Sequence, residues 1–400
     1  MIFPDGNRTP GSAQTDLLAT TGPASQPARF PFLDAIRGIC IFGVVAIHCF
    51  YSPNKSTNTY ATIYSSMMSS GWLGVPIFFV LSGFLIPLPI FSDPDGFDWK
   101  RYAQRRIAKI VPPFVIVVAV IALVETIWHG RPLRGVCIEV LASLSTIAHF
   151  WQPWPPLNGA FWSLYVEVHF YLLLPFLFFG IRHLLIRKSK DAATVTAGIV
   201  VAFFLLFPLF FRVLDAVYLG YFADHESHRF ALFPRVMDYF AWGMLFGLFF
   251  AKNPCFPVRR ARLIGWVGGG GLLAVYGLYA VGKYFNHAQI PYWLVLEGFH
   301  LVTPLFATLS LFLCYEKICS FPVFKSRALI FMGVVSYEWY LLHGPVMIYL
   351  RPFTSPAGGN PIIYLWNTGA PLSLALAATL YFAVSKPLLK LAHQRKPPTP

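Results

Sequence analysis

One segment decides the fold: residues 33–50 read LDAIRGICIFGVVAIHCF and place Arg37 and His48 inside an apolar stretch of spanning length. A charged group at mid-bilayer costs about 2.5–3.5 kcal/mol, so such groups face a protein interior or a watery cavity. The interval from Arg37 to His48 makes about three helical turns and rises about 16.5 Å. We therefore expect both side chains on one stripe at opposite depths, either as an interfacial Arg and a packed core His or as two ends of a functional site.

The composition is that of a polytopic membrane protein. Of 400 residues, 56% are hydrophobic and only 12% are charged, which excludes a large soluble domain. Residues 134–150 are predicted to form an outer interfacial or re-entrant helix rather than a span. Apolar stretches of spanning length predict an all-α bundle of about ten transmembrane helices at 33–51, 71–91, 107–127, 161–180, 191–213, 230–251, 263–282, 299–315, 328–350 and 371–390.

The positive charge follows this predicted topology. The formal net charge is +14, and 23 of the 31 Lys and Arg lie in the N-terminal flank, in 91–109, 182–190, 252–262 and 316–327, and at the C-terminus. Every second connection is thus basic, and the positive-inside rule assigns basic connections to the cytoplasm. We expect both termini to be cytoplasmic, and we expect the lipid bilayer rather than nucleic acid to be the partner of this charge.

The chain ends and the cysteines carry few functional signals. Residues 1–29 are rich in small residues and Pro and predict a disordered cytoplasmic tail, and 392–400 a second short tail, around a membrane domain of 30–391. The six Cys are scattered, match no metal or disulfide spacing, and no metal site is expected. Gly265 and the run Gly268–Gly271 predict close helix packing.

Polar side chains recur at helical spacing on two later spans. One face of the fourth span carries Ser163, Glu167 and Tyr171. One face of the ninth span carries Ser336, Tyr340 and His343. The topology puts Glu167 and His343 in the outer half, near the depth of His48. They form either a structural polar network between helices or a pocket with a histidine base and a carboxylate that orients it.

A basic cluster marks the cytoplasmic start of the third span. Its members are Lys100, Arg101, Arg105, Arg106 and Lys109, of which Arg101, Arg105 and Lys109 form one stripe. The cluster is either a positive-inside anchor or a mouth that binds phosphate through charge-assisted hydrogen bonds. A phosphate-binding mouth inside and a reactive centre near the outer face indicate transfer of a group across the membrane.

Five motifs in order carry a family resemblance. They are Arg37 and His48 with ten residues between them, Gly74–Phe84, Arg105-Arg106 followed by Pro112-Pro113, Phe161–Glu167, and Ser336–His343. From about residue 30 to 390 the chain resembles the membrane acyltransferase-3 family. The resemblance implies ten transmembrane helices in a plasma membrane or bacterial inner membrane. It also implies transfer of an acyl group, usually acetyl, from cytosolic acetyl-CoA or another acyl-CoA to a hydroxyl of an extracytoplasmic polysaccharide, lipopolysaccharide or glycolipid.

The resemblance assigns roles to residues, and the polar pattern adds others. It makes His48 the catalytic histidine, with Arg37 and Glu167 functionally important. Acyl-CoA is expected as a donor substrate, with no permanently bound cofactor. The expected donor-binding residues are Arg101, Arg105, Arg106, Lys109 and Ser82. The expected substrate-pocket residues are Trp162, Ser163, Tyr165, Tyr171, Tyr340 and His343.

Several alternatives stay open at this point. His48 acts either as a general base oriented by Glu167 or as an acyl carrier. Ser82, Ser163 and Tyr165 are equal candidates for the oxyanion donor. The acceptor is alternatively a small hydroxylated molecule such as a macrolide, and a transporter without transferase chemistry would use the same buried charges.

Overall fold

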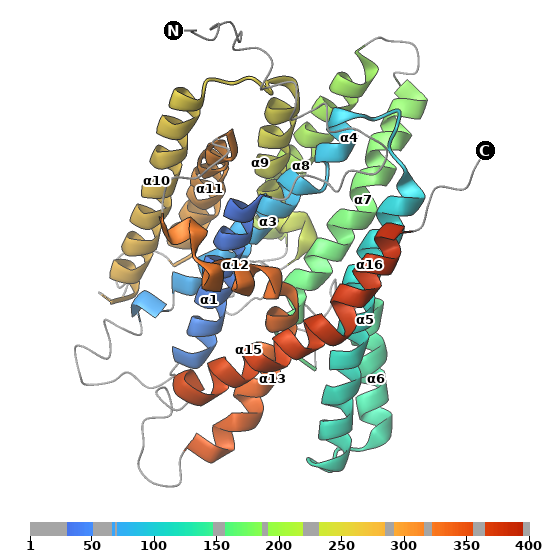
Figure 1. Cartoon of the computed structure of the whole chain (residues 1–400), viewed down its shortest axis with the longest axis vertical. Helices are drawn as coiled ribbons and strands as arrows, with labels where there is room; N and C mark the ends of the chain where they lie inside the picture. The colour runs from blue at the N-terminus through green and yellow to red at the C-terminus, as the bar shows by residue number, and fades with distance from the viewer. Residues whose placement is uncertain are drawn as a thin grey trace, which may run out of the picture.

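The computed structural model describes residues 30–50, 66–68, 70–146, 157–185, 191–218, 232–284, 292–315, 322–354 and 365–394. Within these ranges the chain is almost entirely helical and has no strand, which confirms the predicted all-α class (Figure 1). The predicted tail at 1–29 lies outside the described residues. At the other end, helix α16 continues to Gln394, past the predicted domain boundary at 391.

The helices differ widely in length. The longer ones are α1 (Pro31–Phe50), α5 (Trp99–Ile127), α7 (Phe161–Leu185), α8 (Ala192–Tyr218), α9 (Phe233–Lys252), α10 (Val258–Tyr284), α11 (Tyr292–Ser310) and α13 (Ser336–Leu350). The shorter ones are α3 (Gly74–Leu85), α4 (Leu88–Ser92), α6 (Leu133–Ser145), α12 (Arg327–Val334), α15 (Ala370–Leu380) and α16 (Lys386–Gln394). Single 3₁₀ turns include η2 (Ser70–Leu73), η5 (Leu311–Tyr315), η6 (Pro322–Lys325) and η7 (Arg351–Thr354), and π-helical turns η8 (Leu365–Gly369) and η9 (Tyr381–Ser385) flank α15.

Eight helical segments of the described residues are long and apolar enough to cross a membrane, so the protein is a multi-pass membrane protein. Two further predicted spans are helical without meeting that description. The predicted span 230–251 forms α9, which carries the buried pair Arg235 and Asp238. The predicted span 328–350 divides at Val335 into α12 and α13. The count of ten and the cytoplasmic termini therefore stay predictions.

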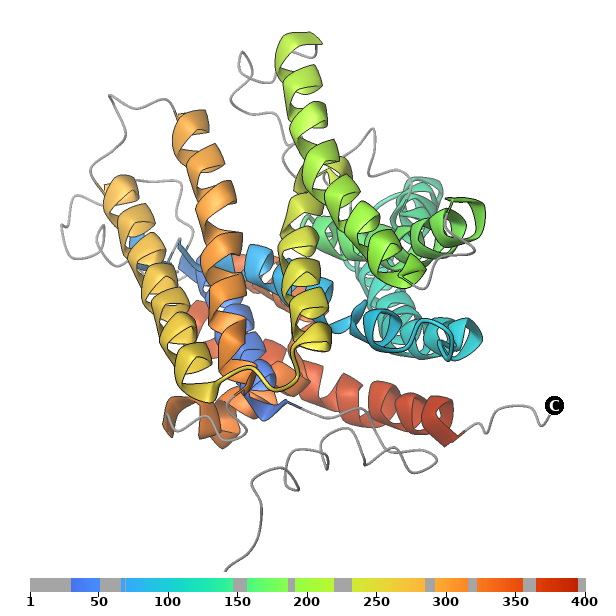
Figure 2. The ribbon, with the colours of Figure 1, turned by 90° about the horizontal axis from the view of Figure 1, so that it is seen from above.

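Helix α1 lies inside the bundle, where α3, α12 and α13 pack against it (Figures 1 and 2). Two glycines permit the approach to α12. A Cβ at Gly38 would overlap the backbone of Leu329, and a Cβ at Gly333 would overlap the backbone of Asp34. Because both backbones meet there, the N-terminal half of α1 is held against α12, and its Arg37 side is directed toward α5 and α13.

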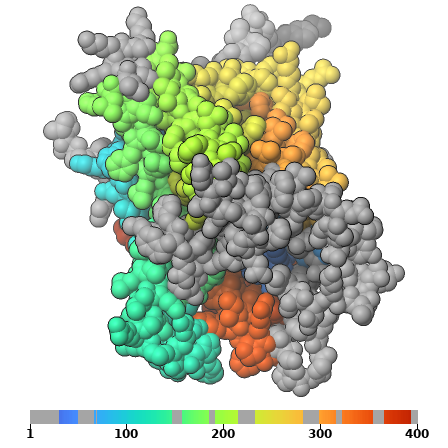
Figure 3. All heavy atoms as spheres, turned by 180° about the vertical axis from the view of Figure 1, so that it is seen from behind, coloured from blue at the N-terminus to red at the C-terminus, as the bar shows by residue number. Residues whose placement is uncertain are grey.

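Within the predicted helix 134–150, α6 spans Leu133–Ser145 and packs against α5, while residues 147–150 lie outside the described part of the chain. The C-terminal part of α13 lies at the same end of the molecule as α6 (Figure 3). Charged and aromatic groups join the two parts: Tyr349 donates to Glu125 at 3.1 Å, and Arg131 bridges Glu125 and Glu139. This network ties α13 to the α5–α6 hairpin, which positions α13 beside the site described next.

Candidate functional site

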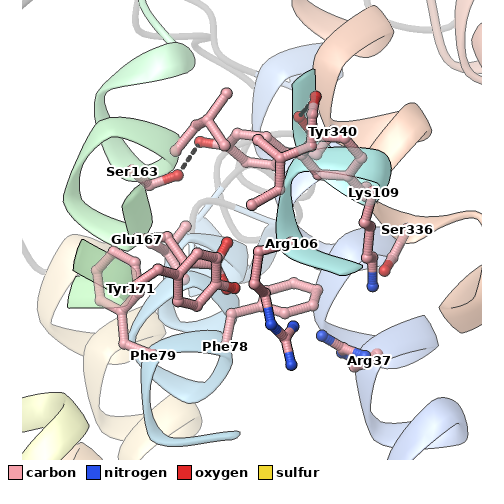
Figure 4. Close-up of a pocket in the computed structure, with 14 residues that line it drawn as sticks. Arg37, Phe78, Phe79, Arg106, Lys109, Ser163, Glu167, Tyr171, Ser336 and Tyr340 are labelled. Carbon is pink, nitrogen blue, oxygen red and sulfur yellow. Dashed lines mark hydrogen bonds between the residues drawn. The ribbon is translucent and has the colours of Figure 1, made fainter. Parts of the chain in front are cut away.

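A pocket opens where α1, α3, α5, α7 and α13 meet (Figure 4). The centres of water molecules can occupy about 70 Å³ of it. A buried water needs about 10–15 Å³ by that measure, so on the order of five waters, or a group of phosphate size, would fit. Its polar lining consists of Arg37, Arg106, Lys109, Ser163, Glu167, Tyr171, Ser336, Tyr337 and Tyr340.

Three cationic side chains converge in this pocket. The head groups of Arg37, Arg106 and Lys109 point toward one another from α1 and α5 (Figure 4). Within the described part of the chain, no hydrogen bond or ion pair joins them to another side chain, and the Nε atoms of both arginines are buried without a partner. Their three positive charges exceed the one negative charge that lines the pocket, that of Glu167, so the entry of a further anion is favoured. The arrangement therefore indicates a binding site for an anion.

Glu167 is the carboxylate of the pocket, and two hydroxyl groups hold it. Ser82 on α3 donates to its Oε1 at 2.5 Å, and Tyr171, one turn further along α7, donates to the same oxygen. The ring of Tyr171 also faces the Arg106 guanidinium at 5.3 Å, with the Tyr102 ring at 5.6 Å, within cation–π range. Glu167 and Arg106 are thus both anchored through Tyr171.

Hydroxyl groups continue from the pocket along α13. Ser163 donates to the Tyr340 hydroxyl at 2.6 Å, and Tyr340 in turn donates to the Ala160 carbonyl at 2.5 Å. The Tyr340 ring lies 5.4 Å from the ring of His343, one turn further on. Tyr340 therefore connects the anion pocket to a histidine that does not line it.

The two histidines meet beyond the pocket. His48 on α1 and His343 on α13 have ring centroids 4.8 Å apart in an edge-to-face arrangement. The Nδ1 of His48 bonds the Val44 carbonyl at 2.8 Å, so that nitrogen carries the proton and Nε2 is left as an acceptor. His48 is exposed, whereas His343 is completely buried. In its neutral form, His48 therefore has an accessible lone pair on Nε2.

The predicted site residues fall into two groups, those that line the pocket and those that do not. Seven predicted site residues line the pocket: Arg37, Arg106, Lys109, Ser163, Glu167, Tyr171 and Tyr340. The other seven lie around it: His48, His343, Arg101, Arg105, Ser82, Trp162 and Tyr165. Of these, Ser82 touches the pocket through Glu167, Trp162 packs against Phe79, and Tyr165 packs against Phe114.

Two expectations differ from the geometry. The described hydrogen bonds of Glu167 run to Ser82 and Tyr171 rather than to His48, whose Nδ1 is taken by Val44. Also, of the predicted stripe Arg101, Arg105 and Lys109, only Lys109 lines the pocket, together with Arg106 from outside the stripe. Sequence analysis did not select Tyr337, Phe78 and Phe79 as lining residues, since an aromatic side chain on an apolar helix is most often core.

Comparisons with known proteins agree with these features. A family model described as an acyltransferase domain (acyltransferase-3) matches residues 30–386. The O-acetyltransferase OatA of Staphylococcus aureus strain NCTC 8325 / PS 47 is 21% identical over 382 residues, which cover 91% of this chain and 58% of that protein. OatA of strain COL is similar to the same extent. This chain spans somewhat under three-fifths of the length of these relatives, and no solved structure matches it.

Proposed function

Because the chain belongs to the acyltransferase-3 family, we propose that it is an integral membrane O-acyltransferase that uses a cytosolic acyl-CoA, acetyl-CoA in the first instance. The acceptor is a hydroxyl of an extracytoplasmic polysaccharide, lipopolysaccharide or glycolipid. The protein lies in a plasma membrane or bacterial inner membrane. The observation that carries this proposal is the convergence of Arg37, Arg106 and Lys109 in one pocket, where three positive charges meet the carboxylate of Glu167. The names of the relatives, O-acetyltransferases, support acetyl as the transferred group.

The pocket binds the phosphate groups of the donor. Guanidinium and ammonium groups hold phosphate through charge-assisted hydrogen bonds, and the volume suits a phosphate group rather than a nucleoside. From Arg37 to His48 the helix α1 rises about 16.5 Å. The pantetheine arm then extends along α1 and brings the thioester to His48.

His48 provides the base. Its unprotonated Nε2 takes the proton from the acceptor hydroxyl, and the hydroxyl oxygen attacks the thioester carbonyl carbon. The carbon–sulfur bond then breaks, and His48 gives its proton to the departing CoA thiolate. No net proton is released, and the products are the ester and CoA.

Sealed inverted membrane vesicles test this function. With [¹⁴C]acetyl-CoA supplied to the cytoplasmic face, we expect label in the glycan fraction of the vesicle lumen and release of CoA. The His48→Gln protein should lose about 10²–10⁴-fold in rate while it still binds CoA, because Gln cannot accept a proton at neutral pH. His183→Gln, at an exposed histidine in the last turn of α7, is the matched control and should transfer normally. Transport of a solute without consumption of acetyl-CoA would contradict the proposal.

A further inference from the structure

Arg106 lies against two aromatic rings, and the proposed function gives a role to only one of them. The guanidinium carbon of Arg106 is 5.3 Å from the centre of the Tyr171 ring and 5.6 Å from the centre of the Tyr102 ring. Tyr171 lines the anion pocket together with Arg106, whereas Tyr102 does not line it. Tyr102 thus approaches a cation of the pocket from outside the pocket.

The two rings belong to different helices and are fixed to each other. Tyr102 precedes Arg106 by four residues on α5, so both side chains lie on one face of that helix. The Tyr102 hydroxyl donates to the main-chain carbonyl of Tyr171 on α7 at 3.1 Å. The Tyr171 hydroxyl donates to Glu167, and the Phe97 ring packs against Tyr102 at 5.6 Å. These contacts hold both rings in place beside the guanidinium.

Arg106 needs this support because two of its charged neighbours repel it. Arg37 and Lys109 line the same pocket and carry the same charge. The Nε of Arg106 is buried, and no acceptor meets it in the described part of the chain. The face of an aromatic ring is negative, so each tyrosine ring attracts the guanidinium. The rings therefore oppose the repulsion that would drive Arg106 out of an empty pocket.

We propose that Tyr102 is a positioning residue for donor binding, which together with the Tyr171 ring keeps the Arg106 guanidinium in the pocket before a phosphate group of the acyl-CoA enters. Tyr102 acts through Arg106 and not through the donor. Because Arg106 is ordered in advance, binding of the donor costs less conformational entropy. The proposal rests on the proposed function for the identity of the anion as a CoA phosphate.

Two substitutions at position 102 separate the ring from the hydroxyl. Tyr102→Phe keeps the ring, which Phe97 still supports, and loses the hydrogen bond to Tyr171, whereas Tyr102→Leu loses both. In calorimetry on purified full-length protein, we expect Tyr102→Phe to keep its affinity for CoA within about threefold. Tyr102→Leu should bind CoA about 5- to 30-fold more weakly, the scale of a desolvated cation–π contact.

Trp99→Leu is the matched control for the loss of an aromatic ring from α5. The Trp99 ring packs against Phe176 of α7 at 5.9 Å and does not line the pocket, so its removal should leave CoA affinity unchanged. An equal loss of affinity in Trp99→Leu and Tyr102→Leu would overturn the proposal. So would an equal loss in the Phe and Leu variants of Tyr102, because the hydroxyl would then be the group that matters.

Combination with Arg106→Gln distinguishes positioning from a general loss of packing. If Tyr102 acts through Arg106, Tyr102→Leu should weaken CoA binding by less than about twofold once residue 106 is Gln, because the two residues belong to one interaction. If the two losses multiply instead, Tyr102 supports the pocket independently of Arg106, and the proposal is wrong.

A measurement without CoA tests the contact in the unmodified protein. In full-length protein labelled with ¹⁵N-arginine in lipid nanodiscs, the proton on Nε of Arg106 should resonate at higher field than that of an ordinary arginine, because aromatic ring currents shield it. Arg106→Gln identifies the signal by its absence. An ordinary position of this signal would overturn the proposal even if no variant of Tyr102 folds. Failure of the unmodified protein to bind CoA, with the shifted signal present, would contradict the proposed function alone.

Discussion

Ser82 and Glu167 are joined by a hydrogen bond of 2.5 Å that crosses from α3 to α7. Ser82 is buried, and Tyr171 donates to the same carboxylate oxygen. With both donors in place, the carboxylate stays in the pocket and its negative charge faces Arg37, Arg106 and Lys109. Glu167 therefore tunes the charge of the anion pocket, a different task from orienting His48.

Replacement of Glu167 by Gln should tighten the binding of CoA. The Gln amide oxygen still accepts from Ser82 and Tyr171, so the fold is kept, while the pocket loses its negative charge. We expect a gain in affinity on the order of tenfold, measured by calorimetry on purified protein. The control is Asp95→Asn, which removes an exposed carboxylate that is paired with Arg182 and does not line the pocket, and it should leave CoA affinity unchanged. Weaker CoA binding by Glu167→Gln would refute this role.

Neighbouring arginines on α5 should differ sharply in donor binding. Arg106 lines the pocket and Arg105 does not. The loss of a charge-assisted contact should weaken CoA binding about 10- to 100-fold in Arg106→Gln, whereas Arg105→Gln should change it less than about threefold, the scale of an exposed charge pair. Equal losses in both variants would indicate that the CoA phosphates also bind Arg101 and Arg105, which do not line the pocket.

Two adjacent glycines on α10 should respond in opposite ways to an added methyl group. A Cβ at Gly268 would overlap the backbone of Leu309 and Ser310, whereas a Cβ at Gly269 meets nothing within 4 Å. Gly268→Ala should therefore lower the melting temperature in detergent, because α10 must move away from α11 and η5. Gly269→Ala should leave it unchanged or raise it, since Ala favours a helix by about 0.8–1.0 kcal/mol over Gly. A stable Gly268→Ala protein would contradict the close packing.

The membrane topology can be tested with a natural thiol. Cys255 is exposed in the turn between α9 and α10, which the basic residues assign to the cytoplasm. In intact cells it should resist a membrane-impermeant maleimide and react after permeabilisation. A thiol introduced by Arg134→Cys, exposed at the start of α6, should react without permeabilisation. The reverse pattern would invert the predicted orientation.

Much of the fold was predictable because apolar length and helical periodicity are local properties. The helix α1 occupies Pro31–Phe50, close to the stretch 33–51 selected by hydrophobicity alone, and α6 is a short helix within 134–150, which was predicted not to be a span. Hydrophobicity is a weaker guide to spanning helices at α9, which packs between α3 and α8. There the buried Arg235 and Asp238 are supported by protein rather than lipid, with Arg212 at 2.9 Å from Asp238.

By itself, the sequence determined the helical class, the approximate limits of most helices and the residue types available for chemistry, because each depends on neighbours along one helix. Only the tertiary structure decided which of those residues share a site. The positions of residues along single helices predicted two separate groups, a basic cluster near the cytoplasmic face and a polar one in the outer half. In the structure, Arg106 and Lys109 from α5 lie with Glu167 from α7 in one pocket. Helix packing also pairs His48 with His343 rather than with Glu167. Such pairings follow from how helices cross and which faces they bury, and no spacing within a single helix contains that information.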